Sequence, residues 1–269
     1  MSQPKQRLQN LYLSNNEIAK LLNPLKTPIL DNPTPTPDYR FEFFFSLSLA
    51  IIATLLVEHS TLDISISQLF YQGNGDWLIT KGTKLPDWIF YTGIKRLLII
   101  FEVYVMLAGL QRVFMAKNPQ HKLAQPLKIF QPFARFSARE LGYLAGVMLL
   151  VPTIVATLKA ITNVPCPNNL LLFGGKFEYL SLWQDIINHS GQKCFPAAHA
   201  SSGFALYAWA FLPSLKKYRW QIAIGVTILA WAMGLYKMAI GDHFFSHTLV
   251  SMCLAWAICS AMAWLIFKK

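Results

Sequence analysis

The chain has 269 residues, of which 54% are hydrophobic and only 14% are charged, and its mean hydropathy is +0.36. Soluble domains carry roughly 25% charged residues, so this composition excludes an ordinary water-soluble domain and predicts an integral membrane protein. The net charge of +11 would suit a nucleic-acid-binding protein. However, the basic residues lie between apolar segments and do not alternate with aromatic residues on a polar face, so we expect no nucleic-acid partner.

The first 40 residues precede the first long apolar stretch. They are polar at first and include a Pro-rich run from Thr27 to Pro37, which is typical of a stiff linker. We therefore divide the chain into a cytosolic N-terminal segment with a Pro-rich linker, residues 1–40, and a membrane domain, residues 41–269.

Spanning helices are expected along the rest of the chain, because a helix needs about 20 apolar residues to cross a bilayer. Six segments are candidates: 41–57, 97–114, 140–158, 200–213, 220–236 and 248–266. The fourth is short, and it reaches a spanning length only if helix continues past Pro213 or begins at the Pro196 turn. The expected fold is all-α, a polytopic membrane protein with six transmembrane helices.

The loop from Glu58 to Thr92 is amphipathic. Such a pattern predicts helical segments that lie along the membrane interface, and Trp77, Trp88 and Tyr91 are suited to anchor them there.

Orientation follows from the distribution of Lys and Arg, which favours cytosolic loops. With the N-terminus inside, the cytosolic segments hold 16 of the 24 Lys and Arg residues. This bias predicts that both termini lie in the cytosol. The polar residues near 159–167, 194–199 and 237–247 then all fall on the outer side.

His199 stands where a polar loop turns into an apolar run, directly after Pro196, Ala197 and Ala198. Unpaired backbone N–H groups at the start of a helix favour an anion, and the small Ala side chains would not block its approach. A lone histidine at a helix start is more often bonded to the backbone. Its neighbours favour an anion site.

His243 and His247 are four residues apart, so on a helix both side chains lie on one face. Two chemical interpretations compete. A pair at this spacing can bind zinc, although the Glu of a His-Glu-x-x-His motif is missing. Alternatively, one imidazole is a nucleophile that its neighbour holds in one tautomer. We favour the nucleophile and expect neither a metal ion nor a cofactor.

Lys159 and Lys237 end apolar runs close to these histidines. A lysine at such a position often only extends its ammonium group to the interface. Beside the histidines, it can also stabilise a phosphoryl group, whose transfer depends on cations and oriented N–H groups. Lys193 and Arg96 are further candidates for this role.

Three blocks now stand in order: Lys159-x6-Cys166-Pro167, Pro196-Ala197-Ala198-His199 and Lys237-x5-His243-x3-His247. Their order and spacing resemble the signature of the type 2 phosphatidic acid phosphatase superfamily, which reads Lys-x6-Arg-Pro, Pro-Ser-Gly-His and Arg-x5-His-x3-Asp. The resemblance covers about residues 90–266. Cys166, Lys237 and His247 depart from it. The sequence also resembles a bacterial subgroup of that superfamily that carries Cys-Pro, Phe-Pro-x-x-His-Ala-Ser and Phe-x-Ser-His-Thr, and this resemblance favours a lipid A phosphatase or a similar lipid phosphatase.

The resemblance implies a role for each matched residue. His243 would attack phosphorus and form a phosphohistidine, His199 would protonate the leaving oxygen, and His247 would orient the nucleophile. Lys159 and Lys237 would belong to a phosphate cradle, to which we add the Ala198 amide and Lys193. The site would be outward-facing, at the periplasmic side of a bacterial inner membrane.

The expected function is therefore removal of phosphate from a lipid-borne phosphomonoester or pyrophosphate, with lipid A, polyprenyl pyrophosphate and phospholipids as candidate substrates. The expected partners are this lipid phosphate and the membrane lipids, with no obligate protein partner. A non-catalytic lipid-phosphate binder and a lipid-to-lipid phosphotransferase remain alternatives. A transporter is disfavoured, because only Glu102 lies clearly inside an expected span.

Four cysteines occur in the chain, and Cys253 and Cys259 lie inside the last apolar run. Cys166 and Cys194 both lie in the central polar loop. They would form a disulfide if that loop faces an oxidising compartment, and would otherwise stay as two thiols.

Overall fold

A computed structural model describes residues 38–57, 60–118 and 127–268. Contacts divide the chain into Met1–Asp38 and Tyr39–Lys269, and Asp38 is the one residue of the first unit that the structure describes. The predicted Pro-rich linker lies outside the described residues.

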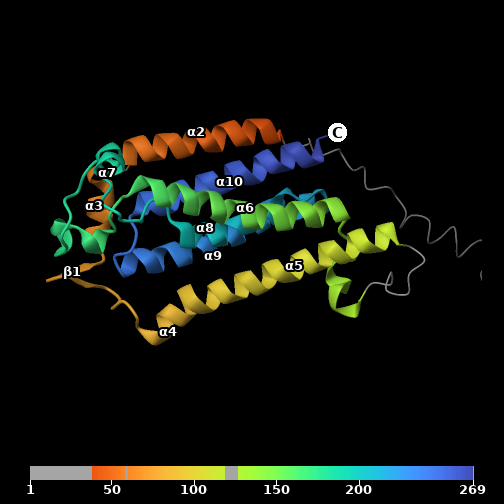
Figure 1. The fold of residues 1–269 in the computed structure, drawn as a ribbon, viewed down its shortest axis with the longest axis horizontal. Coiled ribbons are helices and arrows are strands. Elements are labelled where there is room, and N and C mark those ends of the chain that lie inside the picture. Colours follow the sequence, from red (N-terminus) through yellow and green to blue (C-terminus); the bar gives the residue numbers. More distant parts are fainter. Residues whose placement is uncertain (1–37, 58–59, 119–126, 269) are drawn as a thin grey trace, which may run out of the picture. The chain divides into compact units, whose positions relative to one another are not determined.

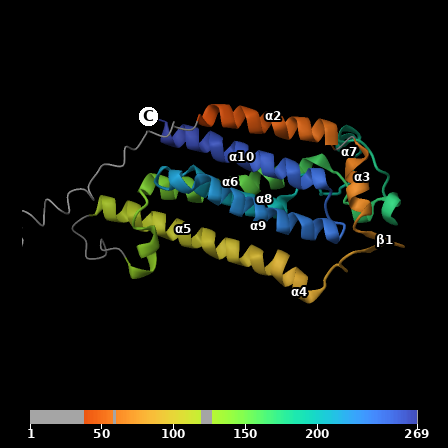
Figure 2. The same ribbon diagram turned by 180° about the vertical axis from the view of Figure 1, so that it is seen from behind.

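In the part of the chain that the structure describes, five long helices form the membrane domain, and each is long and apolar enough to cross a bilayer. They are α2 (Tyr39–Val57), α5 (Gly93–Lys117), α6 (Ala138–Thr162), α9 (Arg219–Ala239) and α10 (Phe245–Phe267). α2 packs along α10, and α6 contacts both α5 and α10 (Figures 1 and 2). These helices confirm five of the six predicted spanning segments and a multi-pass, mainly helical membrane protein.

The fourth predicted span, residues 200–213, has a different form. It consists of α8 (Ala198–Phe204) followed by a 3₁₀ segment, η8 (Ala205–Phe211), with seven residues in each. Together they rise about 25 Å, which is less than the ~30 Å of a bilayer core. Leu212 is extended ahead of Pro213, so the helix stops there. The segment is buried against α6, α9 and α10, so it is a core element of the domain, and a sixth spanning helix is not confirmed.

Shorter elements connect the long helices. They are α3 (Thr61–Gln68), β1 (Tyr71–Gly73), β2 (Asp76–Trp77), α4 (Lys84–Asp87), η3 (Trp88–Thr92), η5 (Lys128–Phe133), η6 (Pro167–Asn169), η7 (Leu171–Phe173), α7 (Leu182–Asn188) and η9 (Pro213–Tyr218).

The loop Glu58–Thr92 differs from its prediction, because an antiparallel hairpin of β1 and β2 interrupts the expected interfacial helices. The turn between these strands has positive φ at Gly73, Asn74 and Gly75. Glycine adopts this conformation freely and asparagine tolerates it, so the sequence Gly-Asn-Gly favours the hairpin over a helix. Trp77 is therefore not a simple interfacial anchor. Its ring lies against Gly241.

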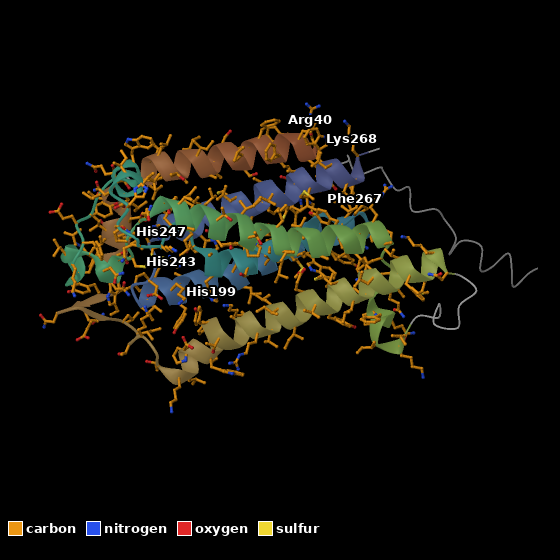
Figure 3. All side chains as sticks on the ribbon, viewed as in Figure 1. Arg40, His199, His243, His247, Phe267 and Lys268 are labelled. Carbon is orange, nitrogen blue, oxygen red and sulfur yellow. A yellow bond between two sulfur atoms is a disulfide. The ribbon has the colours of Figure 1, made fainter. Side chains whose placement is uncertain are left out.

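The two ends of the helices differ in chemistry. Figure 3 shows Arg40 and Lys268 at one end of the domain and His199, His243 and His247 near the other. Between the ends, α2 and α5 expose large apolar side chains, such as Phe45, Leu55 and Ile100. This apolar outer surface fits a lipid environment, and it leaves the polar site at one end of the helices.

Candidate active site

With their flanking residues included, Asn168 after the first block and Cys194 before the second, the three sequence blocks are joined to one another by backbone hydrogen bonds. The Cys194 N–H donates to the Val164 carbonyl at 3.0 Å, and the Ala197 N–H donates to the His247 carbonyl at 3.2 Å. The Asn168 N–H donates to the Gly241 carbonyl at 2.9 Å. Each block is thus bonded to both of the others, which holds their side chains around one space.

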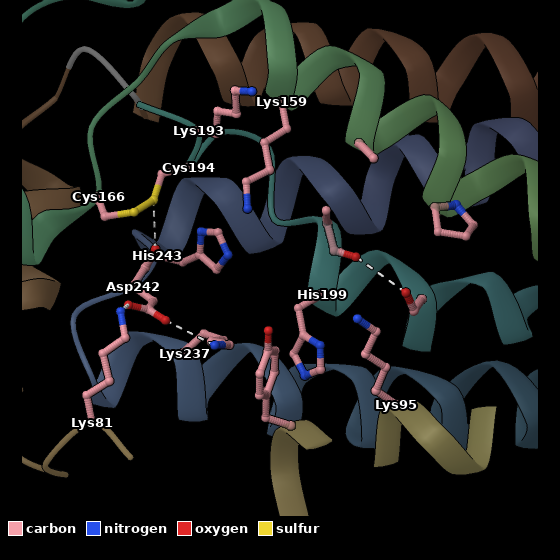
Figure 4. Close-up of a pocket in the computed structure, with 15 residues that line it drawn as sticks. Lys81, Lys95, Lys159, Cys166, Lys193, Cys194, His199, Lys237, Asp242 and His243 are labelled. Carbon is pink, nitrogen blue, oxygen red and sulfur yellow. Dashed lines mark hydrogen bonds and ion pairs between the residues drawn. A yellow bond between two sulfur atoms is a disulfide. The ribbon is translucent and has the colours of Figure 1, made fainter. Parts of the chain in front are cut away.

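A disulfide adds a covalent link between two of the blocks. Cys166 is bonded to Cys194, with their Cα atoms 5.2 Å apart and 28 positions apart in the chain. Cys253 and Cys259 are buried free thiols. Both disulfide residues line the same cavity as the histidines (Figure 4).

That cavity has a volume of about 440 Å³. Residues from α5, α6, α8 and α9 and from the connecting loops line it: Lys81, Tyr91, Lys95, Pro152, Ala156, Lys159, Cys166, Lys193, Cys194, Ala198, His199, Ser202, Lys237, Asp242 and His243. Five of these are lysines, and one acidic residue, Asp242, lines the cavity with them. The excess of positive charge suits an anionic group such as phosphate.

His243 lies in the loop between α9 and α10, where its side chain is 4% exposed. Its Nδ1 is 3.4 Å from Nδ1 of His247, which is fully buried in the first turn of α10. Burial lowers the pKa of His243 well below its usual value, and the nearby His247 and Lys159 lower it further. His243 is therefore neutral at physiological pH, which is the state that a nucleophilic imidazole requires.

A buried carboxylate fixes the start of α10. Asp63 of α3 is fully buried and accepts a hydrogen bond from the Ser246 N–H at 2.8 Å and another from the Ser246 hydroxyl. Acidic side chains at a helix N-terminus satisfy its free N–H groups and favour its dipole. Burial raises the pKa of Asp63 to about 6, although both hydrogen bonds from Ser246 oppose the shift. Asp63 thus positions the turn that carries His243 and His247.

His199 is in the first turn of α8, and its ring position is fixed by η3. Its Nε2 is 2.8 Å from the Phe90 carbonyl oxygen, and its ring makes an edge contact with Tyr91. Because a carbonyl only accepts, Nε2 carries a proton, and Nδ1 is the nitrogen left for a further contact. Burial lowers the pKa of His199 to about 4, although the Phe90 hydrogen bond raises it. A bound phosphate would raise this pKa by attraction of opposite charges.

Two of the cavity lysines, Lys81 and Lys237, contact Asp242, and Lys237 also contacts an aromatic ring. Asp242 accepts hydrogen bonds from Lys81 at 2.8 Å, from Lys237 at 3.0 Å and from the Asn168 amide at 3.1 Å. Lys237 Nζ also lies 3.7 Å from the ring centroid of Tyr91. Burial alone would raise the pKa of Asp242, but the bonds from Lys81 and Lys237 lower it. The carboxylate stays ionised and positions these two ammonium groups.

The predicted site residues are thus distributed as follows. His199, His243, Lys159, Lys237, Lys193 and Ala198 line the cavity, whereas His247 lies behind His243 and does not line it. Lys81, Lys95 and Asp242 also line the cavity and were not among the predicted site residues. Their signal was weak, because Lys81 and Lys95 lie far from the motifs and Asp242 is one of the unspecified positions between Lys237 and His243.

Within residues 38–57, 60–118 and 127–268, no group of three or more His, Cys, Asp or Glu side chains is arranged to hold a metal ion.

Comparison with known proteins gives one match. No curated protein and no solved structure matches the chain. A family model does match, over residues 140–269, a range that begins in α6 and contains all three blocks. The comparison thus shows that residues 140–269 are similar to the PAP2 superfamily.

Proposed function

We propose that this protein is a membrane-embedded phosphatase that removes phosphate from a lipid-borne phosphate ester through a phosphohistidine on His243. Members of the PAP2 superfamily are phosphatases that act on phosphate esters, often those of lipids. The observation that carries the proposal is the cavity in which His199 and His243 lie with Lys159 and Lys237. A nucleophile, a proton donor and cations around one space are the parts that phosphoryl transfer needs.

In the first step, Nε2 of His243 attacks phosphorus, because its Nδ1 faces His247. The bond between phosphorus and the alcohol oxygen breaks as the new P–N bond forms. His199 in its protonated form gives the Nδ1 proton to the leaving oxygen, while Phe90 holds the other side of its ring. Lysine ammonium groups stabilise the charge on the phosphoryl oxygens.

In the second step, water attacks the phosphohistidine. Neutral His199 accepts a proton from this water, the P–N bond breaks, and inorganic phosphate leaves. His243 returns to its neutral state. Burial supports the first step, because the lowered pKa of His243 keeps its ring neutral before the attack.

The proposal also includes the substrate class and the orientation of the protein in the membrane. The substrate is lipid A, a polyprenyl pyrophosphate or a phospholipid, and the site faces the periplasm of a bacterial inner membrane, with both termini in the cytosol. The distribution of Lys and Arg supports this orientation. The apolar outer surface around the helices supports a substrate that is itself held in the bilayer.

The test is phosphate release from a panel of bacterial lipid phosphates by the purified protein in detergent. His243→Ala should abolish release and should also abolish an acid-labile phosphoenzyme labelled with ³²P. His199→Ala should slow release and leave binding intact. Binding of lipid phosphate without release or phosphoenzyme would replace the proposal with a non-catalytic binder, and transfer of label to a second lipid would replace it with a phosphotransferase.

A further inference from the structure

The hydrogen positions on the histidine pair follow from the proposed reaction. Attack by Nε2 of His243 needs a lone pair there, so the proton of this ring lies on Nδ1. It is donated to Nδ1 of His247, which is 3.4 Å away. A neutral His247 that accepts at Nδ1 carries its own proton on Nε2. The reaction therefore requires an acceptor for the Nε2–H of His247.

Nε2 of His247 is fully buried, and no described residue forms a hydrogen bond with it. Aromatic rings pack around the imidazole, with Phe195 at 5.1 Å and Phe244 at 5.3 Å between centroids. The Cys194 backbone is also near this side chain, but Nε2 has no hydrogen bond of normal length and angle. Buried N–H groups are rarely left without a partner, so the site implies one more acceptor.

A second, much smaller cavity lies against His247, and it is separate from the phosphate cavity. It has about 10 Å³ of space for the centre of a water molecule, which is close to the room that one water needs. Val164, Pro165, Leu170, Tyr179, Leu180, Asp185, Phe244 and His247 line it. Asp185, on α7, is 2% exposed, so a carboxylate is buried beside the same space as the imidazole.

We propose that a buried water in this cavity accepts the Nε2–H of His247 and donates to the carboxylate of Asp185, which makes Asp185 a positioning residue of the reaction. This inference rests on the proposed function. A carboxylate accepts about four hydrogen bonds, so another contact of Asp185 is compatible with this one. The chain Asp185–water–His247–His243 fixes both tautomers and leaves Nε2 of His243 free to attack.

The same chain stabilises the intermediate. Transfer of the phosphoryl group to Nε2 of His243 leaves the ring with a proton on Nδ1 and a positive charge. His247 can accept the hydrogen bond but brings no negative charge of its own. Asp185 provides that charge through the water, and an outer carboxylate that orients a functional histidine commonly changes activity by roughly 10- to 100-fold.

The test compares Asp185→Asn with the unchanged protein in steady-state and single-turnover measurements. We expect kcat and the rate of phosphoenzyme formation to fall roughly 10- to 100-fold, with KM and the melting temperature nearly unchanged. Gln184→Ala is the matched control, because it removes the capping contact of α7 with Ser181 and leaves the carboxylate in place. It should have little effect on kcat.

Two further variants separate positioning from folding. His247→Asp places a carboxylate directly beside His243, so in that background Asp185→Asn should cause no further loss of kcat. Val164→Ile adds a methylene at the wall of the small cavity and should displace the water, lowering kcat even if Asp185→Asn does not fold. An unchanged kcat in both Asp185→Asn and Val164→Ile overturns the inference, and so does an equal loss in the His247→Asp background.

Failure of the proposed function gives a different pattern. In that case the unchanged protein forms no phosphoenzyme, and the inference about Asp185 falls with it. If instead the unchanged protein is active and His243→Ala is not, while the Asp185 and Val164 variants match the unchanged protein, only the water-linked chain is wrong.

Discussion

Reduction of the disulfide between Cys166 and Cys194 should destabilise the protein and slow its turnover. The bond closes a loop over 28 positions and joins the first sequence block to the second. Cys166 directly precedes Pro167 and Asn168, and Asn168 bonds to Gly241 beside the nucleophile. Breaking the bond therefore loosens the loop that aligns the wall of the cavity with His243.

The expected magnitude follows from the length of that loop. On the chain-entropy model, closing a loop of about 28 residues stabilises the folded state by about 3.6 kcal/mol. For domains of 150–250 residues each kcal/mol shifts the melting temperature by about 2–4 °C, so reduction should lower it by roughly 7–14 °C.

The assay is thermal unfolding in detergent with and without reductant, together with phosphate release from a lipid phosphate. A Cys166→Ser/Cys194→Ser protein should melt at the temperature of the reduced protein and should no longer respond to reductant. A Cys253→Ala/Cys259→Ala protein is the control and should respond fully, because those thiols are free and buried. A reductant shift under 2 °C, or alkylation of Cys166 and Cys194 without reduction, would refute the reasoning.

Three other predictions follow from single positions. Gly241→Ala should lower both the melting temperature and turnover, because its Cβ would lie 2.3 Å from the Trp77 ring and its φ is +73°. The control Gly225→Ala has open space around its Cβ and should leave the melting temperature unchanged. Thermal unfolding of the two variants tests this. kcat/KM should decline as pH rises, because the pKa of the proton donor His199 is lowered to about 4. The decline in kcat should occur at a higher pH than the decline in kcat/KM, because bound phosphate raises the pKa of His199. A pH-independent rate under chemistry-limited conditions contradicts the role of His199 as proton donor. Asp63 has a pKa of about 6, above its usual value. Its contribution to stability is therefore present below about pH 4 and is lost as pH rises through 6. The melting temperature of the unchanged protein should fall over this pH range, and that of Asp63→Asn should not.

The long helices were predictable because their signal is local. Runs of about 20 apolar residues mark α2, α5, α6, α9 and α10, and the structure extends each predicted range by one to four residues at one or both ends. The segment around α8 was not predictable in the same way. Its apolar side chains would suit either a spanning helix or a buried core segment, and only packing against its neighbours distinguishes the two.

The site was predictable only in part, for a similar reason. Motif order brought His199, His243, Lys159 and Lys237 to notice, because their spacing is a property of the sequence. The partners of these residues are set by tertiary contacts: Phe90 bonds His199 across 109 positions, and Lys81 bonds Asp242 across 161. The Gly-Asn-Gly turn at 73–75 was a local signal for the hairpin that carries Trp77 to Gly241, and it was overlooked.

Cys166, Lys237 and His247 are the three positions that depart from the family signature. Each of these residues contacts a specific partner. Cys166 is bonded to Cys194, Lys237 contacts both Asp242 and the Tyr91 ring, and His247 contacts His243. Lysine lacks the planar fork with which arginine binds two phosphate oxygens. A site with five lysines instead depends on several separate ammonium groups, and Asp242 holds two of them, those of Lys81 and Lys237, in place. Loss of function without selection would remove such contacts one by one, whereas here Cys166 and Lys237 line the cavity with their partners and His247 contacts His243 directly behind it. That agreement favours a working variant of the site over a decayed one.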